Sequence, residues 1–304
     1  MVFFNVLPGA IAEGLIWGLM AIGVYISYKV LDIADLTVDG SICTGACVCA
    51  VLIAMGLPVV VAMLGGFVAG VITGIVTGLL HTALGIPSIL AGILTQLMLY
   101  SVNLTVLGGK SLATIDPRAN NLLVNMSDNP KAIMMMLIIV AMVIISLYLF
   151  FYTEVGLTLK STGDNPDMSR AQGVNVNLNK VVGLAISNGI VALAGTLLAQ
   201  YKGFANINDG RGAIVIGLAA IFIGLSVSMK IKDNFVCSLI GVVTGGVIYY
   251  IVYNVVILMG LKTDFLKMLS AIIVIVFLSV PYLKDTYFSK KVVLPIEPGG
   301  EDHA

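Results

Sequence analysis

Long hydrophobic runs alternate with short polar intervals along the chain. A helix that crosses a bilayer needs roughly 17–25 apolar residues, and most of the runs approach or reach this length. One interval is much longer and more polar; it covers residues 153–180 and reads TEVGLTLKSTGDNPDMSRAQGVNVNLNK. The pattern predicts about nine transmembrane helices, at residues 10–28, 42–56, 60–80, 86–107, 132–152, 181–201, 213–229, 235–259 and 265–283.

Composition supports this assignment. Of the 304 residues, 59% are hydrophobic and 11% are charged, and the mean hydropathy is +1.06. Soluble domains carry roughly a quarter charged residues, so this chain needs the lipid bilayer as its solvent. We therefore expect an all-α polytopic membrane protein. The net charge of zero argues against a nucleic-acid partner.

The two halves of the chain resemble each other, because several glycines recur in matching spans at a constant offset. Five predicted helices fall within that offset, and this odd number makes the two copies inverted in the membrane. We expect one transmembrane domain over residues 1–283, with repeat one at about 10–107 and repeat two at about 181–283. Helix five and the interval 153–180 join them, and 284–304 form a tail. The paired glycines, 175 residues apart, are Gly14 and Gly189, Gly66 and Gly241, Gly70 and Gly245, and Gly85 and Gly260.

A semi-polar stretch containing Asp-Gly follows the first helix of each copy. Inverted repeats place a transport pathway at their interface, and irregular backbone at membrane depth is tolerated only inside protein or beside water. The two stretches could equally be ordinary interfacial loops, and single polar residues could be buried groups satisfied by neighbouring helices. The predicted pathway-lining residues are Asp39, Gly40, Ser41, Thr44, Asn188, Asp209 and Gly210.

Signals for catalysis are weak. His81 and His303 are the only histidines, so the chain offers no triad or histidine-based metal cluster. The sequence GGKS at 108–111 lacks the earlier glycine of a phosphate-binding loop, because Leu104 stands there. We interpret the clustered cysteines as packing residues and predict no catalytic, cofactor or metal site. These cysteines are Cys43, Cys47 and Cys49.

The long polar interval contains the signals of a short helix. Asn165 is a good N-cap, Pro166 suits the first helical position, and Asp167 favours the positive end of the helix dipole. Gly173 suits the C-terminal stop. We predict a helix of about two turns over residues 166–172. It is either an ordinary surface helix or an element that another protein grips.

Basic residues give the orientation. The flank before the first predicted span carries no charged side chain, whereas Lys29 directly follows that span. Three more lysines lie close together in the C-terminal tail. Since basic residues favour the cytoplasmic side, we expect the N-terminus outside and the C-terminus in the cytoplasm of a cell whose plasma (inner) membrane holds the protein. The three tail lysines are Lys284, Lys290 and Lys291.

Three segments in this order resemble a known family: ADLTVDGS, GDNPDMSRAQGVNVN and GFANINDGRGAIVIGLAAIFIG. They are similar to the permeases of ABC importers of the branched-chain amino acid and ribose type, over roughly residues 10–283. In that family a loop ending in Ala-x-Gly carries a coupling helix. The resemblance implies that an ATPase contacts Asp164, Asn165, Pro166, Asp167, Met168, Ser169, Arg170, Ala171, Gln172 and Gly173.

The resemblance also implies partners. A second permease copy, an ABC ATPase subunit on each coupling helix and an extracytoplasmic substrate-binding protein would complete the importer. ATP would bind the ATPase, so this chain would hold no cofactor and would not be an enzyme. Residues 37–41, TVDGS, are most similar to permeases for tryptophan or other aromatic amino acids. The alternatives are a sugar or nucleoside permease, a secondary carrier driven by an ion gradient, and a channel or membrane anchor.

Overall fold

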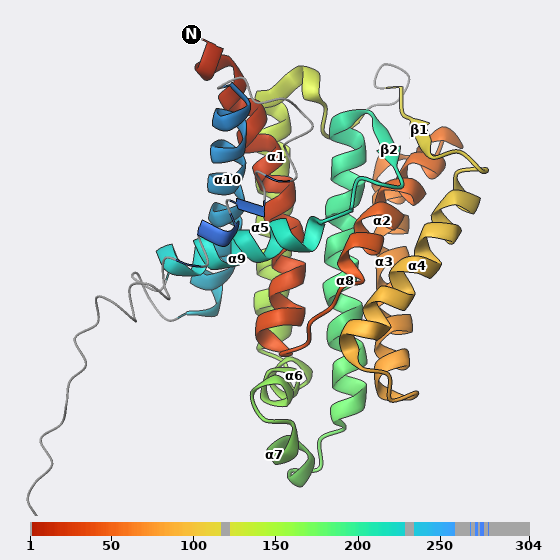
Figure 1. Ribbon diagram of the computed structural model, residues 1–304, viewed down its shortest axis with the longest axis vertical. Coiled ribbons are helices and arrows are strands. Elements are labelled where there is room, and N and C mark those ends of the chain that lie inside the picture. The colour runs from red at the N-terminus through yellow and green to blue at the C-terminus, as the bar shows by residue number, and fades with distance from the viewer. Residues whose placement is uncertain are drawn as a thin grey trace, which may run out of the picture.

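The computed structural model describes residues 2–116, 122–228 and 234–258, together with 268, 271, 272, 274–276 and 279. Ten α-helices and one two-stranded sheet make up this part of the chain (Figure 1). The α-helices are α1 (Val2–Tyr25), α2 (Val38–Ala54), α3 (Val59–Thr82), α4 (Ser88–Val106), α5 (Asn129–Phe151), α6 (Glu154–Asp164), α7 (Pro166–Ala171), α8 (Val176–Lys202), α9 (Ala213–Ser228) and α10 (Phe235–Leu258); the strands are β1 (Leu112–Thr114) and β2 (Phe204–Asn206).

Six of the described helices are long and apolar enough to cross a membrane: α1 with its continuation to Val30, α3, α4, α5, α8 and α10. The chain is therefore an integral membrane protein. Helices α2 and α9 are shorter, with 17 and 16 residues. At 1.5 Å per residue they reach only about 26 Å, less than a bilayer core of about 30 Å. The ninth predicted span, 265–283, lies largely outside the described residues.

Several helix boundaries differ from the hydrophobic pattern, among them the starts of α1 at Val2 and of α8 at Val176, and two of the differences bear on the site. Helix α2 begins at Val38 rather than at residue 42, because its first turn is polar and adds nothing to an apolar run. The first span continues to Val30 through a π-helical turn, Ile26–Val30, in which the N–H of Leu31 bonds the carbonyl of Ile26 at 3.0 Å. The polar residues of 38–41 are thus helical, which the sequence pattern did not predict.

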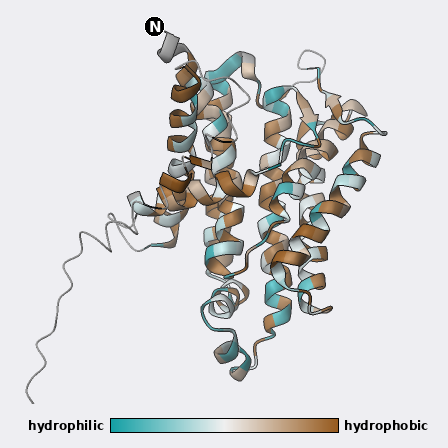
Figure 2. Cartoon of the chain, viewed as in Figure 1, coloured by the Kyte–Doolittle hydropathy of each residue, from teal (hydrophilic) through white to brown (hydrophobic). Residues whose placement is uncertain are grey.

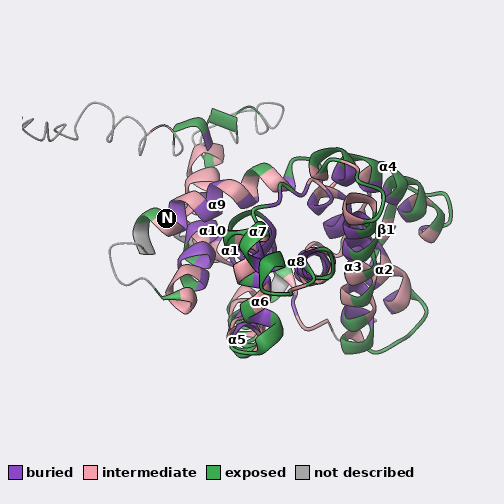
Figure 3. Cartoon of the chain, turned by 90° about the horizontal axis from the view of Figure 1, so that it is seen from below, coloured by how far each residue is buried: buried purple, intermediate pink, exposed green. Residues whose placement is uncertain are grey.

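Helices α1 and α8 form the buried centre of the bundle, whereas α3, α4 and α5 keep broad apolar faces exposed (Figure 3). Glycines permit very close packing here. A Cβ on Gly74 of α3 would lie 2.6 Å from the Cα of Ala185 in α8, and a Cβ on Gly14 of α1 would lie 2.7 Å from the Cα of Val247 in α10. The chain therefore packs α3 on α8 and α10 on α1 backbone to backbone.

The chain turns back into the bundle after both α1 and α8. After α1 it reverses at Asp32, a non-glycine residue with φ of 54°, and after α8 it reverses at Gly203, with φ of 75°. Residues 31–37 and 207–212 then lead to α2 and α9, which begin near the middle of the bundle (Figure 1). We call these two pieces the first and second return segments.

The two ends of the bundle differ in structure. Strands β1 and β2 pair antiparallel, with Ala113 opposite Ala205, at the end where the N-terminus lies, while α6 and α7 lie at the other end (Figure 1). Hydrophilic residues gather on α7 and on the loops around it (Figure 2). Partners at the sheet and at α6–α7 would therefore meet opposite sides of the bundle.

Candidate functional site

The polar interval forms two helices, where the sequence predicted one. Helix α6 begins after Thr153, whose hydroxyl accepts a hydrogen bond from the N–H of Gly156 at 3.3 Å. Its mixed apolar and polar residues form no long hydrophobic run, so the hydrophobic pattern does not predict this helix. The correction matters because α6 is the element that connects the short helix to the bundle.

Helix α7 has the predicted caps. The Oδ1 of Asn165 accepts hydrogen bonds from the N–H groups of Asp167, at 3.1 Å, and Met168, at 3.0 Å. Gly173, with φ of 82°, follows the helix and ends it. The helix stops at Ala171, one residue earlier than predicted, so the N-cap and the glycine stop are confirmed.

Buried hydrogen bonds fix α6 and α7 to each other and to the bundle. The hydroxyl of Ser169 in α7 donates to that of Ser161 in α6 at 3.2 Å. The side-chain amide of Asn179 in α8 donates to the hydroxyl of Thr162 in α6 at 3.0 Å. Gly163 packs against the carbonyl of Val30 so closely that a Cβ would overlap it. Helix α6 therefore sits directly on the end of the first span.

The outer surface of α7 is exposed. Met168 is 59% exposed, and Asp167 and Arg170 form a solvent-facing ion pair of 3.1 Å. Of the predicted ATPase contacts, Ser169 is buried and Pro166 is half-buried, while the others are exposed. Ser169 thus holds α7 in place, whereas the remaining residues form a surface on which a partner could dock.

A buried carboxylate organises the inner end of the first return segment. Asp35 is only 3% exposed. Its Oδ1 accepts the N–H of Thr37 at 2.9 Å, and its Oδ2 accepts the side-chain amide of Asn188 in α8 at 2.7 Å. Both oxygens are therefore satisfied, as buried polar groups require, and the return segment is tied to the central helix α8.

Hydroxyl groups extend this network into three more helices. The hydroxyl of Ser41 in α2 donates to Oδ1 of Asn188 at 2.6 Å and lies 2.8 Å from that of Thr73 in α3. In parallel, Thr37 lies 2.8 Å from Thr77, which donates to Thr95 of α4 at 3.1 Å. The predicted pathway residues Ser41 and Asn188 are thus brought together, but inside a packed network.

Asp39, in the first turn of α2, ties that helix to the second return segment and to the start of α9. Its carboxylate accepts hydrogen bonds at 2.9 Å from the N–H groups of Gly212 and Ile214, where α9 begins. The N–H of Gly210 also donates to Sγ of Cys43, at 3.0 Å. Asp39 therefore caps a helix in the other half of the chain, and the two stretches that the sequence singled out lie in contact.

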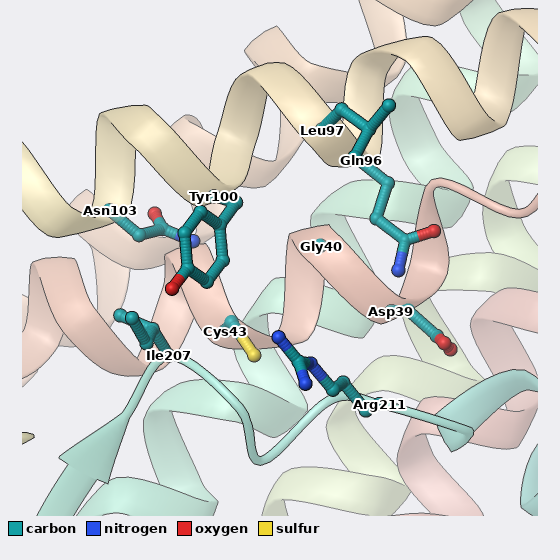
Figure 4. Close-up of a pocket in the computed structure, with 9 residues that line it drawn as sticks. All are labelled: Asp39, Gly40, Cys43, Gln96, Leu97, Tyr100, Asn103, Ile207 and Arg211. Carbon is teal, nitrogen blue, oxygen red and sulfur yellow. The ribbon is translucent and has the colours of Figure 1, made fainter. Parts of the chain in front are cut away.

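A cavity of about 460 Å³ opens beside this contact, between α2, α4 and the second return segment (Figure 4). The predicted residues Asp39 and Gly40 line it. Thr44 lines a separate apolar groove, and Asp209 pairs with Lys202 at 3.6 Å. The complete lining of the cavity is Asp39, Gly40, Cys43, Gln96, Leu97, Tyr100, Asn103, Ile207 and Arg211.

The sequence pattern did not predict three polar residues that line this cavity, Tyr100, Asn103 and Arg211. Gln96 is a polar residue within an apolar span, which the sequence pattern singles out, whereas Tyr100 and Asn103 were missed. These two residues follow Gln96 at helical spacing on one face of α4, and this spacing is the signal that could have found them. Arg211 lies next to the predicted Gly210, and the sequence pattern assigned it no role. Their meeting in one cavity depends on how the second return segment folds back against α4.

Comparisons with known proteins agree with this architecture. Residues 7–278 match the family described as the permease component of branched-chain amino acid transport systems. A tyrosine transport system permease protein of Clostridioides difficile is 36% identical over 267 residues, 88% of either chain. An uncharacterised protein of Rickettsia prowazekii is 32% identical over 279 residues, 90% of this chain and 97% of its own.

More distant relatives are named for the transport of other molecules. An autoinducer 2 import system permease protein of Yersinia pseudotuberculosis is 29% identical over 210 residues, 68% of this chain and 58% of its own. No solved structure matches significantly. The match over most of the chain shows that this protein belongs to the permease family of branched-chain amino acid and ribose-type ABC transport systems.

Proposed function

We propose that this chain is the transmembrane permease subunit of an ATP-driven importer for an aromatic amino acid such as tryptophan or tyrosine. The observation that carries the proposal is the α6–α7 unit, an exposed short helix fixed by buried contacts to the start of the first return segment. Two copies of the chain would form the pathway. A separate ATPase would bind each α7, and this chain would hold no nucleotide.

The contacts suggest how an ATPase would act on the pathway. Movement of α7 would reach α6 through Ser169, and α6 touches Val30 through Gly163. Val30 leads directly into the first return segment, and Asp39 with its bonds to the start of α9 follows in the first turn of α2. A short series of rigid contacts thus runs from the docking surface to the cavity, as a lever between two states requires.

The inverted repeat remains our proposal for the symmetry of this mechanism. A Cβ on Gly14 would lie 3.3 Å from the carbonyl of Gly246, and one on Gly189 would lie 2.9 Å from Val71. Positions 14 and 189 are 175 residues apart, as are 71 and 246. The two contacts are therefore related by the glycine offset, as a pseudo-two-fold axis between the halves would produce.

Orientation follows from the same proposal. The ATPase works in the cytoplasm, so α6 and α7 would face inward, and the N-terminus with the β1–β2 sheet would face outward. An extracytoplasmic binding protein would then deliver the substrate at the sheet end, and the C-terminal tail would be cytoplasmic. Residues 164–173 would contact the ATPase, with Ser169 acting from inside the unit.

The substrate class rests on similarity. The relative that is 36% identical is named for tyrosine transport. The TVDGS stretch at 37–41 also resembles permeases for aromatic amino acids. A sugar permease is the second candidate, because a xylose transport permease of Haemophilus influenzae is 30% identical over 88 residues. That match covers only 29% of this chain, so an aromatic amino acid is favoured.

Reconstitution tests the proposal. The chain is placed in liposomes with its cognate ATPase and binding protein, and uptake of labelled tyrosine, tryptophan and xylose is measured with and without ATP. We expect amino-acid uptake only when the ATPase and ATP are both present. Uptake by the chain alone, driven by an ion gradient, would show a secondary carrier; ATP-driven uptake of xylose alone would show a sugar permease.

A further inference from the structure

Asn103, which lines the cavity described above, carries a buried polar atom without a partner. The residue is only 1% exposed, it lines the cavity, and its Oδ1 has no hydrogen-bond partner among the described residues. Leaving a buried polar group unpaired costs about 1–3 kcal/mol, and nearly all such groups in folded proteins are satisfied. The unpaired acceptor indicates that a donor from outside the chain completes this site.

Arg211 provides a positive charge on another wall. Its guanidinium reaches into the cavity toward α2 (Figure 4), and it forms no ion pair with another residue in the described part of the chain. The backbone beside it is fixed, because the next residue, Gly212, donates its N–H to Asp39 at 2.9 Å. Arg211 is exposed, and a guanidinium with free donors suits a carboxylate, which it can bind through two parallel hydrogen bonds.

An aromatic and partly apolar wall lies between these two groups. Tyr100 stands one turn from Asn103 on α4 and is 43% exposed, and Leu97 and Ile207 line the cavity beside it. A tyrosine ring offers a stacking surface to another aromatic ring. The volume of about 460 Å³ is within the range of about 300–1,000 Å³ that small-molecule sites occupy.

We propose that this cavity is a recognition site for an amino-acid zwitterion within the permease itself. Arg211 binds the α-carboxylate, the Oδ1 of Asn103 accepts a hydrogen bond from the α-ammonium, and Tyr100 contacts an aromatic side chain. The inference rests on the proposed function and deepens it, because it assigns part of the substrate selectivity to this chain. A neutral sugar would leave the guanidinium without an anion, so the site disfavours sugars.

Binding of substrate analogues to the wild-type protein provides the first test. The full-length chain, in nanodiscs with its ATPase, is titrated with L-tyrosine, with tyramine, which lacks the carboxylate, and with 3-(4-hydroxyphenyl)propionate, which lacks the ammonium. We expect each analogue to bind at least about tenfold more weakly than L-tyrosine, since each loses a charged contact. Equal affinity for all three compounds would overturn the proposal.

Two substitutions assign the contacts to residues. Arg211→Gln should abolish the preference for L-tyrosine over tyramine and keep the preference over the propionate. Asn103→Leu should do the reverse. Lys131→Gln, which removes a cation that is 82% exposed at the start of α5, is the matched control and should change neither preference. If either cavity variant folds but keeps both preferences, the assignment of its contact is wrong; Arg211→Ala or Asn103→Ala, which also removes the contacting group, replaces a variant that does not fold.

Failure of this inference differs from failure of the proposed function. If the reconstituted importer takes up tyrosine with ATP while the cavity variants keep wild-type analogue preferences, the permease imports amino acids without this site. If the wild-type importer takes up sugars and no amino acid, the proposed function fails first. The inference stands only when amino-acid uptake and residue-specific loss of discrimination occur together.

Discussion

The carboxylate of Asp39 accepts a hydrogen bond at 2.9 Å from the N–H of Ile214, although 175 residues separate the two positions. The same offset relates the paired glycines of the two halves. Residues 39 and 214 would therefore be equivalent positions in the proposed repeat, and equivalent positions that touch each other lie on the pseudo-two-fold axis. This contact marks the point where the two halves of the chain meet.

Removal of the Asp39 carboxylate should destabilise α9. Asp39→Ala deprives the N–H groups of Gly212 and Ile214 of their acceptor, and loss of a helix cap costs about 1 kcal/mol. We expect a lower unfolding temperature in detergent. Asp128→Ala, which breaks only an exposed pair with Lys131, should leave it nearly unchanged; an equal effect of both changes would rule out a special role for Asp39.

Loss of the buried Asp35 carboxylate should be more severe. Asp35→Ala leaves the N–H of Thr37 without an acceptor and the amide of Asn188 with only the carbonyl of Leu184, at a cost of about 3 kcal/mol. Asp35→Asn keeps one acceptor oxygen and should cost less. Asp32→Asn is the control, because Asp32 is exposed and Asn tolerates its positive φ. Thermal unfolding of the three purified variants checks the order.

The close contact between α3 and α8 should tolerate no side chain. In Gly70→Ala the added Cβ would overlap the Cβ of Ala192 and the carbonyl of Asn188, and such overpacking costs about 1–3 kcal/mol. Gly65→Ala, on the same helix, meets only the side chain of Leu52, which can move. Gel filtration should show aggregation or loss for the first variant only; a monodisperse and equally stable Gly70→Ala protein would contradict the packing described.

Bulky residues at the end of α7 should prevent ATPase binding. Ala171→Trp alters an exposed surface, and Gly173→Leu places a side chain where φ is 82°, which strains the helix stop. Both lie outside the membrane spans, so insertion should be normal. Copurification of the ATPase should be lost in both variants and retained in Lys110→Trp, an exposed position near the opposite end. If the ATPase copurifies normally with Ala171→Trp and Gly173→Leu, α7 is not the docking surface.

Loss of the hydrogen bond between α6 and α8 should reduce transport without weakening ATPase binding. Asn179→Leu removes the buried hydrogen bond to Thr162 and leaves the surface of α7 unchanged. We expect the ATPase to copurify normally, while uptake per ATP hydrolysed falls by about threefold, since residues within a coupling network modulate it by about 0.5–2 kcal/mol. Leu178→Ala changes an exposed neighbour on α8 and should keep wild-type coupling. An undiminished ratio in Asn179→Leu would mean that movement passes by another route.

The hydrophobic pattern determined much of this protein. Runs of apolar residues specify membrane helices because lipid provides no hydrogen bonds to an irregular backbone. Local signals also specified α7, since an N-cap at Asn165 and a glycine at 173 act within a few residues of themselves. The Asp-Gly stretches were found because polar residues interrupt apolar sequence, although Asp39 belongs to a helix and its role as a cap to α9 was not visible.

Only the tertiary structure decided which polar groups meet. Asp35, Ser41 and Asn188 form one buried network because Asn188 of α8 bonds both the first return segment and α2. The place of α6 in the proposed lever became visible only from its contacts with Val30 and α8. The cavity brings Asn103 and Arg211 together from segments more than a hundred residues apart. A sequence determines local conformation through nearby residues, but contact between distant side chains depends on the path of the folded backbone.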